Sequence, residues 1–337
     1  NMPFINDIAT FKSLSIVGLE KNTGKTECLN YILGRLKDSE KRIALTSIGI
    51  DGESKDIVTN TPKPEIKIGK GTIFISAEKH YLQRRITSEI LDVSNIRTSL
   101  GRLVIARAIS ADKVLLSGPP DTHTLKDLIS EMDKYGIDLT IVDGALSRLS
   151  LASPAVTEGM VLATGAALSA NIPKLVRKTK YVVDLIALPE VEQPLKDKLD
   201  MIDEGIHAID DAGEIHDLNI KSVFVLEKSK ETIFVHGNRL YVAGAASNNL
   251  FEFLRMQKNL SDIELIVKDF TKIFATPNLF YLFITRGGTV KVVQKTNLAA
   301  VCINPISPQG YKLNSNELRT ALQDALQLPV YDIKNLN

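Results

Sequence analysis

The stretch Gly18-Leu-Glu-Lys-Asn-Thr-Gly24-Lys25-Thr26 lies between an apolar run and an amphipathic segment. Residues 14–17 are typical of a buried strand, and residues 26–36 place their leucine and isoleucine side chains on one helical face. A strand, a tight turn and a helix in this order leave unpaired N–H groups at the helix N-terminus. Together with the helix dipole, these groups favour a bound polyphosphate.

The spacing of the two glycines departs by one residue from the usual phosphate-binding loop. Five residues separate Gly18 from Gly24, whereas the P-loop pattern has four, so Leu19 occupies the usual first glycine position. We expect the extra residue to widen the loop without moving the Gly-Lys-Thr turn. The pattern then predicts that Lys25 reaches the outer phosphates and that the Thr26 hydroxyl binds Mg²⁺.

The predicted contacts to ATP or GTP extend from the loop tip into the first helical turn. Lys21 and Asn22, at the tip, either contact phosphate or are solvated. The residues predicted to bind the nucleotide are Lys21, Asn22, Thr23, Gly24, Lys25, Thr26 and Glu27. The alternative is a structural turn without a ligand, because Gly-Lys-Thr also occurs in unrelated proteins.

Three carboxylates follow apolar strands and are candidates to hold Mg²⁺. Asp143 follows the strand-like residues 139–142, and Asp51 and Glu53 follow residues 43–48. Ligands of open parallel sheets bind at the carboxyl edge, where these side chains are expected. We expect Asp143 to hold the ion, and Asp51 or Glu53 to complete its shell or activate a nucleophile. Alternatively, Asp143 only caps a turn, and the other two are solvated acids.

Further segments are weaker candidates for the same edge of the sheet. Arg148 either neutralises phosphate charge or is a surface arginine. Thr164 and Gly165 end another strand and are candidates to line the cleft. The loop at residues 304–311 holds two prolines and a glycine, and it either walls a base or acceptor pocket or is only a shaped turn.

Composition restricts the classes of partner. The chain has 337 residues and a net charge of +1, from 41 basic and 40 acidic residues, which is not an electrostatic footprint for nucleic acid. No apolar run is long enough for a membrane span, and no signal peptide is expected. Its two cysteines, Cys28 and Cys302, are expected to be buried thiols. A cytoplasmic protein without nucleic-acid or membrane partners is therefore expected.

Alternating strand-like and helix-like segments predict an α/β fold with a mostly parallel sheet flanked by helices, of the P-loop NTPase type. We expect one domain at residues 2–188, with a β-rich segment at 70–118. We expect residues 189–337 to form a second part with a β-rich elaboration, either as a separate domain or as a continuation of the same sheet. Strand-like runs occur at residues 182–187, 221–225, 232–235, 240–243, 263–268, 282–285 and 289–293.

Five segments together resemble a known family, the reactivase-associated subunit encoded beside lysine 5,6-aminomutase in amino-acid-fermenting bacteria. The segments are Ile16-Val-Gly-Leu-Glu-Lys-Asn-Thr-Gly-Lys-Thr26, Thr46-Ser-Ile-Gly-Ile-Asp-Gly-Glu53, Thr61-Pro-Lys-Pro64, Val142-Asp-Gly-Ala-Leu-Ser-Arg148 and Ala163-Thr-Gly-Ala166. The resemblance covers most of the chain and is strongest before about residue 170.

The resemblance implies a helper protein for a radical enzyme that uses adenosylcobalamin and pyridoxal phosphate. Such a reactivase uses ATP or GTP with Mg²⁺ to eject a damaged cobalamin from its partner. Carried over by position, Gly24, Lys25 and Thr26 would hold phosphate, and Asp143 would serve Mg²⁺. The partner would be the aminomutase or a second reactivase subunit, and a homo-oligomer is an alternative. Together with the position of Asp51 after a strand, the predicted catalytic residues are Lys25, Asp143 and Asp51. If that second subunit is the main ATPase, the longer loop marks a weak or regulatory site. Two alternative functions are a small-molecule kinase or ATP-dependent ligase, and a scaffold protein that binds no nucleotide.

Overall fold

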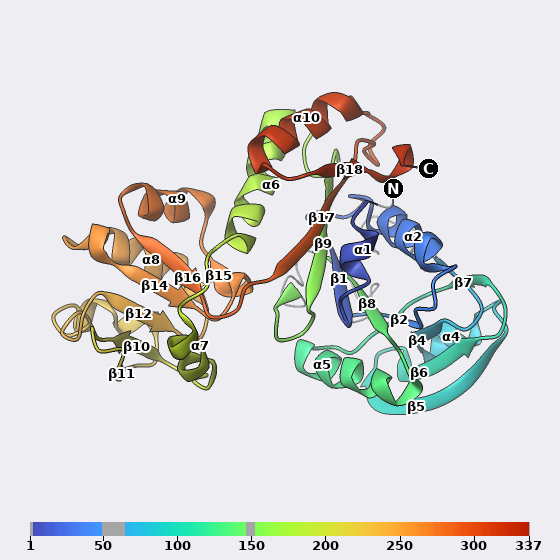
Figure 1. Ribbon diagram of the computed structural model, residues 1–337, viewed down its shortest axis with the longest axis horizontal. Coiled ribbons are helices and arrows are strands. Elements are labelled where there is room, and N and C mark those ends of the chain that lie inside the picture. Colours follow the sequence, from blue (N-terminus) through green and yellow to red (C-terminus); the bar gives the residue numbers. More distant parts are fainter. Residues whose placement is uncertain (1–2, 49–64, 146–151, 337) are drawn as a thin grey trace. The chain divides into compact units, whose positions relative to one another are not determined.

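The computed structural model describes residues 3–48, 65–145 and 152–336. Two compact units make up the chain (Figure 1). The first unit consists of Asn1–Lys180 together with Asn297–Asn337, and the second of Tyr181–Thr296. The chain passes from the first unit to the second within helix α6 (Ile172–Ile186).

A nine-stranded sheet forms the centre of the described part of the first unit. In order across the sheet its strands are β18 (Val330–Asp332), β17 (Asn297–Asn304), β9 (Gly159–Gly165), β1 (Ser13–Gly18), β8 (Leu139–Ala145), β2 (Ile43–Ser47), β4 (Ile73–Ala77), β6 (Gly101–Ala108) and β5 (Ser88–Thr98). Neighbouring strands from β18 to β4 run parallel, while β6 is antiparallel to β4 and to β5. The predicted mixed α/β architecture with a large, mostly parallel sheet is confirmed.

Helices cover both faces of this sheet, because alternate strand residues are apolar on each side. On β4, Phe74 belongs to one buried cluster and its neighbours Ile73 and Ile75 to another. The first cluster includes residues of α1 (Ile5–Ile8), α2 (Lys25–Leu36), η7 (Ile333–Asn335) and the antiparallel pair β3 (Ile66–Ile68) and β7 (Asp112–Val114). The second cluster includes residues of α5 (Thr122–Glu131) and η1 (Met132–Tyr135). The described part of this unit also contains α4 (Glu78–Leu82), α10 (Ser315–Leu326) and the first part of α6.

The last strands of the chain belong to the first sheet. Strand β17 pairs in parallel with β9, and β18 pairs with β17. Whether the second half of the chain continues the first sheet is open from sequence alone, and in the structure two of its strands, β17 and β18, do so. This return places the end of β17 beside the end of β9, at the same edge as the end of β1.

The second unit is itself an α/β unit. Its sheet has the order β11 (Ile215–Ile220), β10 (Ile206–Ile209), β12 (Arg239–Val242), β14 (Glu264–Val267) and β16 (Thr289–Val292). The last three strands run parallel, and the chain passes through α8 (Asn248–Arg255) and α9 (Pro277–Thr285) between them. The remaining elements are α7 (Gln193–Asp200), η3 (Val223–Val225), η4 (Glu227–Ser229), η5 (Leu260–Asp262), η6 (Phe270–Lys272) and the parallel pair β13 (Ala246–Ser247) and β15 (Ile273–Phe274).

Several strand predictions in this region are wrong. Residues 182–187 lie largely in helix α6 and residues 282–285 in helix α9, while residues 221–225 and 232–235 form turns and 3-10 helix. In α6, Leu175, Thr179, Val183 and Ile186 are buried at helical spacing. A short apolar run at a helix end has the same composition as a buried strand, so packing decides between them.

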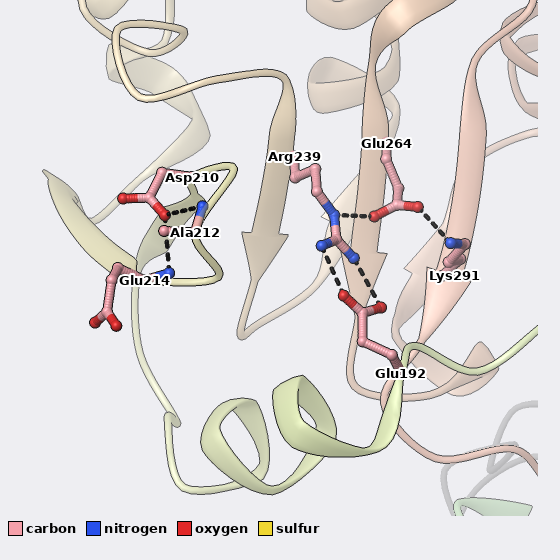
Figure 2. A network of polar contacts seen from close by, with 7 residues as sticks. All are labelled: Glu192, Asp210, Ala212, Glu214, Arg239, Glu264 and Lys291. Carbon is pink, nitrogen blue, oxygen red and sulfur yellow. Dashed lines mark hydrogen bonds and ion pairs between the residues drawn. The ribbon is translucent and has the colours of Figure 1, made fainter.

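A network of ion pairs joins the start of α7 to the sheet of the second unit (Figure 2). The guanidinium of Arg239 donates two hydrogen bonds to the Glu192 carboxylate, at 2.8 and 3.0 Å. It donates a third to Glu264, whose other oxygen lies 2.6 Å from the Lys291 ammonium. The bonds from Arg239 lower the pKa of Glu192 from 4.5 to about 2.

We predict that the Glu192–Arg239 ion pair makes the stability of the second unit depend on pH. The folded-state pKa of Glu192 lies below its unfolded value, so its contribution is complete above about pH 5 and disappears as the pH falls toward 2. The difference in unfolding free energy between wild type and Glu192→Gln, from urea titrations, should therefore shrink over that range. A difference that stays constant with pH would contradict the assignment. The effect is modest because half of the Glu192 side chain is exposed.

Candidate functional site

The loop between β1 and α2 is held by a hydrogen bond to β9 and by one within the loop. The Leu19 N–H donates to the carbonyl of Ala163 at 2.9 Å, which extends the pairing of β1 with β9 by one residue. The Thr23 hydroxyl donates to the carbonyl of Glu20 at 2.8 Å and folds the loop back. A Cβ atom on Gly18 would lie 2.6 Å from that hydroxyl oxygen, so a larger residue there would displace the Thr23 side chain.

These contacts explain why the widened loop tolerates leucine where a glycine is usual. The side chain of Leu19 is buried, and the residue continues the strand rather than turning away from it. The left-handed positions of the loop are Asn22 and Gly24, with φ of 60° and 93°. Gly24 is the N-cap of α2, so the turn directly before Lys25 needs the freedom of glycine.

Lys25 and Asp143 form an ion pair at the carboxyl edge of the sheet. The Lys25 Nζ atom lies 3.0 Å from Asp143 Oδ1, and both side chains are less than one-fifth exposed. Apart from this pair, Asp143 Oδ1 is buried without a hydrogen-bond partner among the described residues. In register, Asp143 lies between Ile16 of β1 and Ser47 of β2. The structure therefore brings the two strongest sequence candidates together.

The other predicted loop residues differ in their exposure. Thr23 is buried, Gly24 and Thr26 are half-buried, and Lys21, Asn22 and Glu27 are exposed. Thr26 lies in the first turn of α2, beside Lys25 in sequence. Glu27 lies in the same turn, where a carboxylate suits the helix dipole but would repel a phosphate. Lys21 and Thr26 are therefore better placed by charge and chemistry than Glu27.

Several candidates lie outside the described residues or away from the loop. Asp51, Glu53 and Arg148 fall in the undescribed segments. Thr164 is fully buried and shares a 2.9 Å hydrogen bond with Thr179 of α6, so its hydroxyl joins a helix to the sheet and lines no cleft. Gly165 permits a close approach of the Asn304 backbone, because a Cβ atom there would lie 2.1 Å from the Asn304 carbonyl oxygen.

Asn304 begins the candidate loop at residues 304–311, but the sequence pattern assigned it no contact of its own. The side-chain amide of Asn304 donates to the carbonyl of Asn22 at 3.1 Å. A Cβ atom added to Gly24 would lie 3.1 Å from the Cβ atom of Asn304. The first residue of the loop at residues 304–311 therefore contacts the phosphate-loop candidate. Whether this loop walls a pocket stays a prediction. The available signal was an asparagine before a proline at the end of an apolar strand.

The cysteines are buried thiols, as predicted. Cys28 of α2 and Cys302 of β17 are free, and their sulfur atoms lie 3.7 Å apart. The contact with Cys28, together with burial, raises the pKa of the Cys302 thiol. In the described part of the chain, no group of three or more His, Cys, Asp or Glu residues is arranged to hold a metal ion.

Comparison of the chain with models of protein families, with curated proteins and with solved structures found no match. Among the described residues, no helix has the length and apolar character that a membrane crossing requires.

Proposed function

We propose that the loop at residues 18–26 binds ATP or GTP with Mg²⁺, in a chain with the P-loop NTPase type of fold. The observation that carries this proposal is the Lys25–Asp143 pair at the N-terminus of a 12-residue helix. The Gly24 cap leaves the first N–H groups of that helix without intrahelical partners, and such groups suit phosphate oxygens. The proposed phosphate contacts are Lys21, Asn22, Thr23, Gly24, Lys25 and Thr26.

The ion pair has a simple electrostatic meaning in this proposal. Without nucleotide, Asp143 neutralises the Lys25 ammonium at 3.0 Å. With nucleotide bound, Lys25 would exchange this carboxylate for phosphate oxygens, and Asp143 and the Thr26 hydroxyl would hold Mg²⁺. Mg²⁺ would supply neutralisation of phosphate charge. Asp51 and Glu53, which follow β2 in sequence, stay candidates to complete the metal shell.

We further propose that nucleotide binding serves a helper function on a protein partner. The resemblance of five segments to the reactivase-associated subunit supports an adenosylcobalamin-dependent lysine aminomutase as that partner. The mechanism is a population shift, in which the nucleotide acts only through its different affinity for two conformations. Lys25 and Asp143 would distinguish the nucleotide-free from the nucleotide-bound protein, because each would have a different partner in these two states.

Asp143→Asn should weaken nucleotide binding only when Mg²⁺ is present. The change keeps the side-chain shape and removes the charge that a hard cation prefers. We expect the Kd for Mg·ATP, from calorimetry, to rise about tenfold or more, which corresponds to about 1.4 kcal/mol. In excess EDTA the Kd should change little or fall, since Lys25 loses a competitor for phosphate. Asp138→Asn, directly before the first residue of β8, is the matched control and should bind as wild type does.

Turnover measurements separate the helper from its rivals. ATP hydrolysis that requires the aminomutase, with release of cobalamin, is the result expected of the helper. Hydrolysis coupled to a small acceptor without the aminomutase would replace this proposal with a kinase or ligase. No binding of ATP or GTP with Mg²⁺ at millimolar concentration would leave only a scaffold role.

A further inference from the structure

Asn304 connects three segments that are far apart in the sequence. Its Nδ2 atom donates to the Asn22 carbonyl, 282 positions away, at 3.1 Å. Its Oδ1 atom accepts from the Ile306 N–H at 3.1 Å, and its carbonyl accepts from the Ala166 N–H at 2.8 Å. Both ends of the amide and the backbone are therefore engaged, so the side chain has one orientation.

The segment that carries Asn304 is itself held in place. The Tyr311 hydroxyl donates to the Ala166 carbonyl at 2.6 Å. The Ser307 N–H donates to the Tyr311 carbonyl at 2.9 Å, and the Leu313 N–H donates to the Pro305 carbonyl at 2.8 Å. Because these hydrogen bonds fix the segment that carries Asn304, the Asn304 side chain can restrain the residue to which it binds. A side chain on a mobile segment would move together with that residue.

The partner that Asn304 restrains is the strained part of the phosphate loop. Asn22 and Gly24 both have left-handed backbone conformations. Asn304 donates a hydrogen bond to the Asn22 carbonyl, and a Cβ atom added to Gly24 would lie 3.1 Å from the Asn304 Cβ atom. A non-glycine residue at positive φ persists only where its surroundings hold it. Because the Asn22 carbonyl belongs to the peptide unit that carries the Thr23 N–H, fixing that carbonyl also fixes the direction of that N–H.

We propose that Asn304 is a positioning residue, which holds the loop in its phosphate-accepting shape before nucleotide arrives. This inference rests on the proposed nucleotide function of the same loop. Without the Asn304 amide, the loop would become ordered only when nucleotide binds. The entropy lost in that ordering would lower the affinity for nucleotide. Asn304 acts through the loop backbone and needs no contact of its own with the nucleotide.

Asn304→Ala is the direct test, because alanine keeps the Cβ atom beneath Gly24 and removes the amide. We expect the Kd for Mg·ATP to rise about tenfold, as for the loss of one hydrogen bond and its ordering. Amide hydrogen exchange at residues 19–25 should become faster in the nucleotide-free protein. Asn304→Asp keeps the acceptor for Ile306 but cannot donate to Asn22, and it should show the same faster exchange.

Asn297 offers a matched control at the other end of β17. Its side-chain amide also donates to a backbone carbonyl, that of Glu158, at 3.0 Å. Asn297→Ala should leave both the Kd and the loop exchange unchanged. Wild-type affinity and unchanged exchange in Asn304→Ala would overturn the inference, as would equal effects of both substitutions. If wild type binds no nucleotide, the proposed function fails, and hydrogen exchange alone still decides whether Asn304 orders the loop.

Discussion

Replacing Lys25 with alanine should abolish the rise in melting temperature that ATP or GTP with Mg²⁺ gives the wild-type chain. A ligand at 100 times its Kd stabilises the folded state by about 2.7 kcal/mol. For a unit of this size, that corresponds to a shift of roughly 5–10 °C in its melting transition. Lys25 is the only lysine or arginine that the structure places against Asp143 within the described residues, so no other described cation compensates for it there.

The substitution also changes the nucleotide-free protein, and the two effects must be separated. Removing the ammonium leaves the largely buried Asp143 carboxylate unpaired, which should cost about 1–3 kcal/mol of stability. The double variant Lys25→Ala/Asp143→Asn removes both charges and should regain most of this loss. It should still show no shift with nucleotide. A full shift in either variant would rule out the loop as the nucleotide site.

The sequence pattern predicted the local part of this site well. Strand β1, the turn at Gly24 and helix α2 follow from apolar periodicity and from a glycine before the helix, which are properties of neighbouring residues. The pairing of Asp143 with Lys25 follows from one further rule, that parallel strands end at the same edge. Burial of both cysteines follows from the apolar segments that contain them.

Contacts between distant segments could not be predicted in the same way. Asn304 meets Asn22 only because β17 returns to the first sheet beside β9, and no local pattern records that return. Thr164 looks like a cleft residue at a strand end, yet helix α6 covers it. The short apolar runs at residues 182–187 and 282–285 have a composition that favours strands, yet tertiary packing makes them parts of helices α6 and α9.

Gly118→Ala should be among the most destabilising single substitutions in the first unit. A Cβ atom on Gly118 would lie 1.3 Å from the Ser47 carbonyl oxygen, at the end of β2. No side-chain rotation relieves an overlap with backbone, so the chain must separate there. Two hydrogen bonds to the Ser117 carbonyl, from the Ser47 N–H and the Thr46 hydroxyl, would be strained or lost. We expect a loss of about 3 kcal/mol or more in unfolding free energy.

Gly34→Ala is the matched control, and its expected effect has the opposite sign. Gly34 is an exposed residue within α2, and a Cβ atom there would have no neighbour within 4 Å. Alanine in a helix interior is about 0.5–1 kcal/mol more stable than glycine. Urea titrations of both variants should therefore shift in opposite directions. Because Ser47 lies beside Asp143 in register, a folded Gly118→Ala protein should also bind Mg·ATP more weakly, whereas Gly34→Ala should bind it normally.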